Sequence, residues 1–186
     1  MSNRLAVIIV FVAGLLFVGS NSIYILNEME RGVLLRVGAV VNADIPTGIH
    51  LKLPFIEEVR AFDGRVLTVD APAERFLTLE KKALIVDSFA KFRIKKVEKY
   101  YTATSGDQRR AEELLKQRIN NGLRNEISKR TLHEVVSGQR DELMIDLVAS
   151  LNEVADQELG VEVVDVRVKR IDLPQEVSQS VYNRMN

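Results

Sequence analysis

Residues 5–26 read LAVIIVFVAGLLFVGSNSIYIL, and the rest of the chain has to fit what this stretch does. The part from Leu5 to Gly19 carries no charge. As a helix the whole stretch is about 33 Å long, enough to cross a bilayer core of about 30 Å. Its large apolar side chains favour insertion by on the order of −5 kcal/mol in total. We therefore expect a transmembrane signal anchor over residues 5–26, preceded by a short cytoplasmic tail over residues 1–4.

Two alternatives to an uncleaved anchor are a cleaved signal peptide and a buried helix of a soluble domain. A signal peptide has a basic region ahead of its apolar core and an A-x-A-like cleavage site. Here Arg4 is the basic side chain ahead of the run, Gly19–Ser22 contains no pair of alanines, and apolar residues resume at Ile23. A soluble amphipathic helix carries one apolar stripe, whereas this run is apolar all round. The sequence therefore favours an anchor, and the short tail favours a cytoplasmic N-terminus.

The composition limits the function of the remaining residues, about 160 of the 186, which suit one domain or two small ones. Basic and acidic residues number 26 each, so the chain has neither the basic excess nor the basic stripe of a nucleic-acid-binding protein. The sequence contains no cysteine. Disulfides, thiol catalysis and cysteine-ligated zinc are therefore excluded within it.

Residues 27–95 predict a mostly antiparallel β-rich subdomain. Ile49, Leu51 and Leu53 alternate with polar residues, which predicts a half-buried strand that stops at Pro54. Pro46-Thr47-Gly48 predicts a turn before it. The other strands are expected at residues 33–41, 59–69 and 83–94, with Asp63-Gly64 as a bulge or turn and Glu80-Lys81-Lys82 as a turn.

Residues 96–172 predict an α/β subdomain of two helices and a strand. Capping boxes at Ser105–Gln108 and Thr131–Glu134 bracket a helix of about 23 residues. Its apolar stripe is Ala111, Leu115, Ile119, Leu123 and Ile127. A second helix is expected over residues 139–159, with Leu143, Leu147, Leu151, Val154 and Ala155 as its stripe and Gly160 as its end. A strand follows from Val161, although its alternation leaves the buried face mixed.

Residues 173–186 predict the start of a further helix, because Pro174 suits a first helical turn. Val177, Val181 and Met185 then form an apolar stripe that reaches the end of the sequence. An exposed stripe of this kind continues in a longer helix or meets a partner. We therefore expect this sequence to be the front part of a longer protein.

The residues themselves give no support for catalysis. The two histidines, His50 and His133, are far apart in sequence, and each is best interpreted as structural. No G-x-S-x-G, G-x-G-x-x-G or G-x-x-x-x-G-K-[ST] motif occurs. We therefore predict no catalytic, cofactor-binding or metal-binding residues and no cofactor. The charge clusters at residues 80–82 and 91–96 are typical of a solvated strand edge, with a lipid-headgroup patch as the alternative.

Four stretches carry a resemblance to a known family: ERGVLLRVG (30–38), GIHLKLPFI (48–56), EKKALIVDS (80–88), and VEVVDVRVKRIDLPQEVS (161–178) with YNRM (182–185). Together they resemble the SPFH family (stomatin/prohibitin/flotillin/HflK-HflC), also called Band 7. The resemblance implies an α+β fold. It consists of an N-terminal transmembrane helix, an SPFH domain made of an antiparallel β subdomain and an α/β subdomain, and the start of a long C-terminal coiled-coil helix.

The resemblance also implies a function. Its bacterial branch suggests a single-pass protein of the inner membrane with the body in the periplasm. It implies alternating assembly with the paralogue HflK into a membrane cage around the AAA+ protease FtsH, which that cage regulates without catalysis of its own. Two other functions stay open from the sequence. One is a lipid-microdomain organiser without a protease partner, and the other is a membrane-anchored hydrolase that uses His50 or His133.

Overall fold

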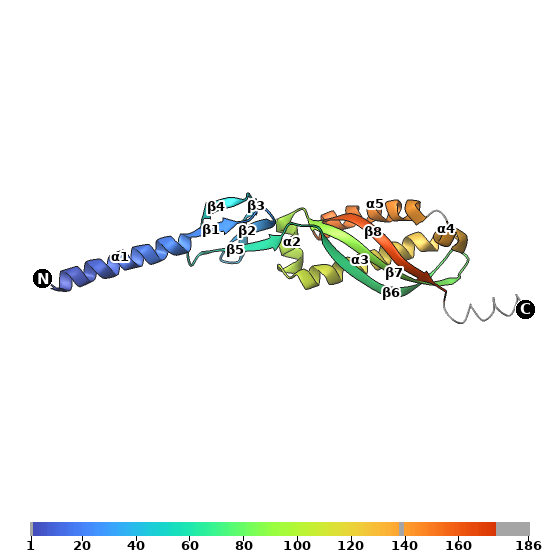
Figure 1. The fold of residues 1–186 in the computed structure, drawn as a ribbon, viewed down its shortest axis with the longest axis horizontal. Coiled ribbons are helices and arrows are strands. Elements are labelled where there is room, and N and C mark those ends of the chain that lie inside the picture. The colour runs from blue at the N-terminus through green and yellow to red at the C-terminus, as the bar shows by residue number, and fades with distance from the viewer. Residues whose placement is uncertain (1, 138–139, 174–186) are drawn as a thin grey trace, which may run out of the picture. The chain divides into compact units, whose positions relative to one another are not determined.

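The computed structural model describes residues 2–137 and 140–173, with some side chains in α1 and around residue 140 left out. The chain divides into two compact units, residues 1–65 (unit 1) and residues 66–186 (unit 2). Figure 1 shows their elements, which mix helices with antiparallel strands. This division differs from the predicted subdomain boundary at 95/96, which stays a prediction. One strand of the expected β subdomain, at residues 83–94, pairs with the strand from Val161, which we expected in the α/β subdomain.

Unit 1 contains one helix and two small antiparallel sheets, with strand orders β1-β4 and β3-β2-β5. Its core holds Leu26, Val33, Leu35 and Ile45. The elements are α1 (Ser2–Ser22), β1 (Ile23–Leu26), β2 (Glu30–Arg36), β3 (Ala39–Ile45), β4 (Gly48–Leu51) and β5 (Glu57–Asp63).

Two expectations in unit 1 are wrong in detail. The helix ends at Ser22, and residues 23–26, which we expected to belong to the anchor, form β1 instead. The expected single strand over 33–41 is a hairpin that turns at Val37 and Gly38, both with positive φ. A two-residue turn of this kind needs left-handed backbone, which Gly38 adopts without strain. Among the described residues, no helix combines the length and the apolar character needed to cross a membrane.

Unit 2 is a three-stranded antiparallel sheet, in the order β6-β7-β8, with its helices packed on it. Helix α3 contacts β6, α5 contacts β8, and the two helices contact each other. Figure 1 shows both helices running along the same sheet. The elements are β6 (Leu67–Leu77), β7 (Ala83–Ile94), α2 (Val97–Thr104), α3 (Gln108–Ser128), α4 (Leu132–Ser137), α5 (Arg140–Glu158) and β8 (Val161–Asp172).

The predicted helix stripes form part of the core of unit 2. All five stripe residues of α3 are buried, and in α5 all are buried except Val154, which is half-buried. Close packing of the two helices depends on Gly122, where an added Cβ would lie 2.7 Å from Leu147 Cδ1. The mixed alternation in β8 has a cause: Lys91 pairs with Asp165 and Phe92 with Val163, so Val164 is an extra residue in a bulge.

Of the two predicted capping boxes, one is absent from the structure and the other is present. The first is wrong, because Asp107 caps α3 by accepting a hydrogen bond from the Arg109 N–H, and Ser105 ends α2 in a left-handed conformation. The second is confirmed, since the Thr131 N–H donates to Glu134 Oε2 at 2.7 Å and Glu134 N–H donates back to Thr131 Oγ1. The predicted helix over 174–186 lies outside the described residues.

Candidate membrane-contact surface

A backbone hydrogen bond links the last residue of α1 to the residue that follows β4. Lys52 N–H donates a hydrogen bond to the Ser22 carbonyl at 2.7 Å. Strands β1 and β4 pair from that point, with Ile23 opposite Leu51 and Ile25 opposite Ile49. Residues that lie opposite each other in an antiparallel pair share a face. The four side chains therefore form one continuous apolar face directly beside the helix.

This β1–β4 face is open to solvent in unit 1. Ile49 and Leu51 are 73% and 75% exposed, and Ile23 and Ile25 are exposed as well. The predicted alternation is present, but the apolar side chains are not the buried ones. His50 and Lys52 are half-buried, whereas Ile49, Leu51 and Leu53 are exposed. The reversal arises because no helix of unit 1 covers the apolar side of this two-stranded sheet in the described part of the chain.

The loop after β4 carries an exposed aromatic side chain in a strained backbone conformation. Phe55 has a φ of 72° and is 86% exposed. A bulky residue in the left-handed region costs free energy, and such residues cluster at functional sites. Next to it Ile56 is exposed too. The surrounding structure must therefore hold this loop in place.

Glu57 provides that support. Its Oε2 accepts a hydrogen bond from Leu53 N–H at 2.8 Å, and its own N–H donates to the Leu53 carbonyl at 2.9 Å. Its other oxygen accepts from Arg36 Nη2 at 2.7 Å. The hydrogen bond from the Leu53 backbone, followed by that from Arg36, lowers the pKa of the Glu57 carboxyl group. The carboxylate is therefore held ionised, with the loop closed around it.

The turn of the β2–β3 hairpin adds to the same surface. Val37 N–H donates to the Ile56 carbonyl at 3.2 Å, so the two connections lie side by side. Val37 is exposed and has a φ of 50°. We call Val37, Leu53, Phe55 and Ile56, together with the β1–β4 face, the apolar end of unit 1. Exposed apolar side chains that are grouped in this way are typical of a surface that contacts a membrane or another protein.

His50 lies on the other face of the β1–β4 sheet and is engaged structurally. Its Nε2 is 2.7 Å from the Pro46 carbonyl, and its ring lies 5.5 Å from that of Tyr24, centroid to centroid. His133 belongs to unit 2, where it lines a cavity beside Leu132 and Val136. In the part of the chain that the structure describes, no group of three or more His, Asp or Glu residues is arranged to hold a metal ion.

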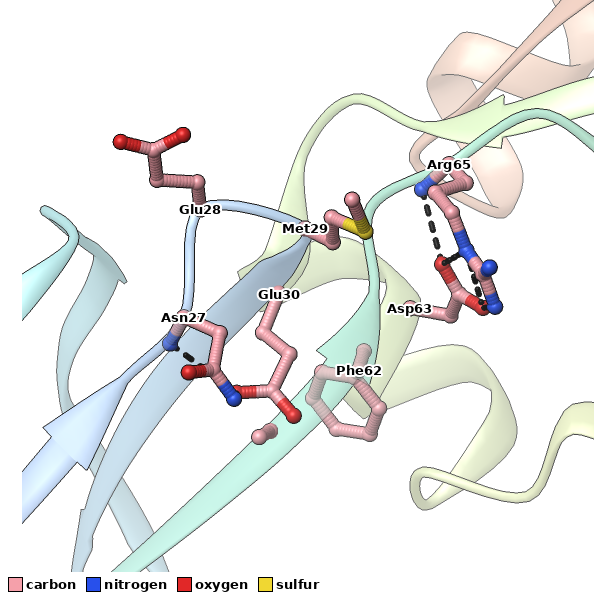
Figure 2. A pocket seen from close by; sticks show the side chains of 8 residues that line it. Asn27, Glu28, Met29, Glu30, Phe62, Asp63 and Arg65 are labelled. Carbon is pink, nitrogen blue, oxygen red and sulfur yellow. Dashed lines mark hydrogen bonds and ion pairs between the residues drawn. The ribbon is translucent and has the colours of Figure 1, made fainter.

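A cavity of about 530 Å³, with both charged and apolar lining residues, lies elsewhere in unit 1 and includes the loop between β1 and β2. Figure 2 shows Asn27 beside Glu30 and Asp63 beside Arg65, while Glu28 points away from both pairs. Arg65 Nη2 donates to Asp63 Oδ2 at 2.6 Å, and this pairing lowers the pKa of the Asp63 carboxyl group. These two pairs engage the carboxyl groups of Glu30 and Asp63, whereas Glu28 lines the cavity outside both pairs.

Comparison with known proteins identifies the class of protein. Residues 24–186 match the SPFH domain / Band 7 family. The chain belongs to this family.

Within this family, the chain is similar to individual proteins named HflC. The chain is 44% identical over 174 residues to Protein HflC of Haemophilus influenzae, covering 89% of this chain and 59% of the relative. It is 36% identical over 230 residues to the Modulator of FtsH protease HflC of Escherichia coli (strain K12), covering 100% of this chain and 68% of the relative. Protein HflC of Buchnera aphidicola (from Schizaphis graminum) is 40% identical, with 65% of its length covered. The chain thus spans about three fifths to two thirds of these relatives.

Sequence reasoning missed the exposed loop residues of the apolar end. The signal was present in Leu53-Pro54-Phe55-Ile56, an apolar run in which a proline prevents a continuous strand. Nothing local in the sequence showed that Val37 would lie beside Ile56, because that proximity comes from the pairing of β2 with β5.

Proposed function

We propose that this chain is the membrane-proximal part of a non-catalytic scaffold that assembles with the paralogue HflK and regulates FtsH. Membership of the SPFH family and the name of the E. coli relative, a modulator of FtsH protease, support the regulatory role. The observation that carries the membrane role is the apolar end of unit 1, where Phe55 is 86% exposed.

The proposed arrangement places residues 5–22 in the bacterial inner membrane, residues 1–4 in the cytoplasm, and the remainder, which begins with β1 at Ile23, in the periplasm. The uncharged sequence Leu5–Gly19 and the exposed apolar side chains along α1 support the anchor. The hydrogen bond from Lys52 to Ser22 keeps the apolar end beside the last turn of α1. Lipid contact with the apolar end then supplements the anchor, and each apolar side chain removed from water contributes about 1.5–3 kcal/mol.

A lipid-quenching experiment tests the membrane contact. The sequence has no cysteine, so Phe55→Cys and Ile145→Cys each carry one label. Both positions are exposed, but Ile145 lies on α5 of unit 2 and serves as the matched control. In vesicles that contain brominated lipids, we expect quenching of an environment-sensitive dye at position 55 and none at position 145. Equal quenching at both positions would contradict the proposal.

Co-purification tests the partners separately. The tagged protein, solubilised gently from its own membranes, is expected to bring down HflK and FtsH together. Recovery of lipid and HflK without FtsH would favour a lipid-microdomain organiser. Loss of a hydrolytic activity on replacing His50 and His133 with alanine would instead favour the anchored hydrolase.

A further inference from the structure

A second cavity, of about 480 Å³, lies within unit 2 between α4 and the ends of β7 and β8. Its apolar lining is Leu84, Leu132, Val136, Ile171 and Leu173. Leu84 is fully buried at its floor, whereas Val136 and Leu173 are exposed at its mouth. The cavity is thus an apolar hollow that opens to the surface of unit 2.

Glu80, Lys82 and Asp172 line this hollow, and each has an ion-pair partner. Lys82 Nζ lies 2.7 Å from Glu80 Oε2, and Asp172 accepts a hydrogen bond from Arg170. A ligand that needs charged partners would have to break these pairs. An apolar side chain entering the hollow would leave them intact and would cover Leu84 and Ile171. The lining therefore favours an apolar occupant.

The chain itself supplies such an occupant at the mouth of the cavity. Strand β8 ends at Asp172, and Leu173, the next residue, lines the cavity. The following segment carries the apolar stripe Val177, Val181 and Met185 at helical spacing. Val177 is four residues beyond Leu173, a reach of about 6 Å in a helix and at most about 14 Å in an extended chain. A tethered segment this short has a high effective concentration at the hollow.

We propose that the cavity receives the apolar stripe of residues 174–186 of the same chain, with Val177 entering first. The segment is then seated against α4 and the end of β8, and unit 2 sets the direction in which the predicted C-terminal helix continues. We call this binding of residues 174–186 in the cavity the seat. It involves unit 2 alone, so its test is independent of whether FtsH is a partner.

A crosslinking pair tests the seat directly in the protein as it stands in membranes. Val136→Cys combined with Val177→Cys places one thiol at the mouth and one on the stripe. The control pair combines Val136→Cys with Gln179→Cys, because position 179 lies on the opposite side of a helix with 3.6 residues per turn. With a short bismaleimide, we expect the first pair to form a bond within one chain about tenfold faster than the control pair.

Two crosslinking results would overturn the proposal. A bond that joins two chains would show that the cavity receives a second copy. Equal rates for the two pairs would show that the stripe does not face the cavity.

Protection from labelling gives a second measurement that needs no crosslink. A single cysteine at position 136 is labelled with a monofunctional maleimide in two backgrounds. Val177→Asp with Val181→Asp is expected to raise the labelling rate several-fold, since the charged stripe leaves the cavity. Gln179→Asp with Asn183→Asp is the matched control and is expected to leave the rate unchanged. The same rate in both backgrounds would also overturn the seat.

Discussion

Two phenylalanines show how differently the two units use apolar residues. Phe92 in unit 2 is 0% exposed, whereas Phe55 in unit 1 is 86% exposed. Unit 2 has a second layer, because α3 and α5 cover one face of its sheet. In the described part of unit 1 no helix covers the β1–β4 face. A domain is stable when each apolar face meets another layer, and the described elements of unit 1 supply no such layer for the β1–β4 face.

The largest expected effect is the difference in the free energy of unfolding between alanine substitutions of the two phenylalanines. Phe92→Ala removes a fully buried ring and should lower the free energy of unfolding by about 3–5 kcal/mol. Phe55→Ala should change it by less than about 0.5 kcal/mol, because the ring is already in solvent. Urea unfolding of the solubilised protein, followed by circular dichroism, measures both. A loss at Phe55 as large as that at Phe92 would mean that the loop is part of a folded core.

Two glycines with positive φ, one in each unit, allow the same comparison for backbone strain. Gly160 and Gly38 both have positive φ, 65° and 83°. A Cβ at Gly160 would lie 2.4 Å from the Lys96 carbonyl oxygen, whereas nothing lies within 4 Å of one at Gly38. We expect Gly160→Ala to cost about 3 kcal/mol from strain and the clash together, and Gly38→Ala about 1 kcal/mol from strain alone. Similar losses in the same unfolding measurement would show that unit 2 relaxes around the added methyl group.

The smallest expected effect is on the pH dependence of stability. Glu126 in unit 2 accepts hydrogen bonds from Arg130 at 2.5 Å and Lys129 at 2.9 Å, and these bonds lower the pKa of its carboxyl group. A carboxyl group whose pKa is lower in the folded state stabilises the protein above its unfolded pKa, about 4.3. That contribution disappears as the pH falls through the folded pKa.

Substitution of this carboxylate tests the assignment. Glu126→Gln should flatten the acid side of the stability curve measured by urea unfolding between pH 3 and pH 7, a range set around the carboxyl pKa of about 4.3. In unit 1, Glu57→Gln should flatten it too, since the pKa of Glu57 is also lowered, first by the Leu53 N–H and then by Arg36. An unchanged acid limb in Glu126→Gln would show that other groups control acid unfolding of unit 2.

Local patterns were sufficient for helices α3 and α5 of unit 2 but not for the assembly of the unit. The helical stripe from Ala111 to Ile127 is buried as predicted, because a spacing of three to four residues places side chains on one face of any helix. The Thr131–Glu134 capping box is likewise a short-range hydrogen-bond exchange. The pairing of β7 with β8 joins residues about 80 positions apart, and no local signal encodes such a pairing.

The apolar end of unit 1 shows the same division. The sequence by itself determined that Ile49, Leu51 and Leu53 alternate with polar residues and that Leu5–Gly19 is uncharged. Only the tertiary structure decided that these apolar side chains face solvent, that residues 23–26 form a strand, and that Val37 lies beside Ile56. The physical reason is that periodicity fixes which residues share a face, whereas burial of that face depends on whether another layer, distant in sequence, covers it.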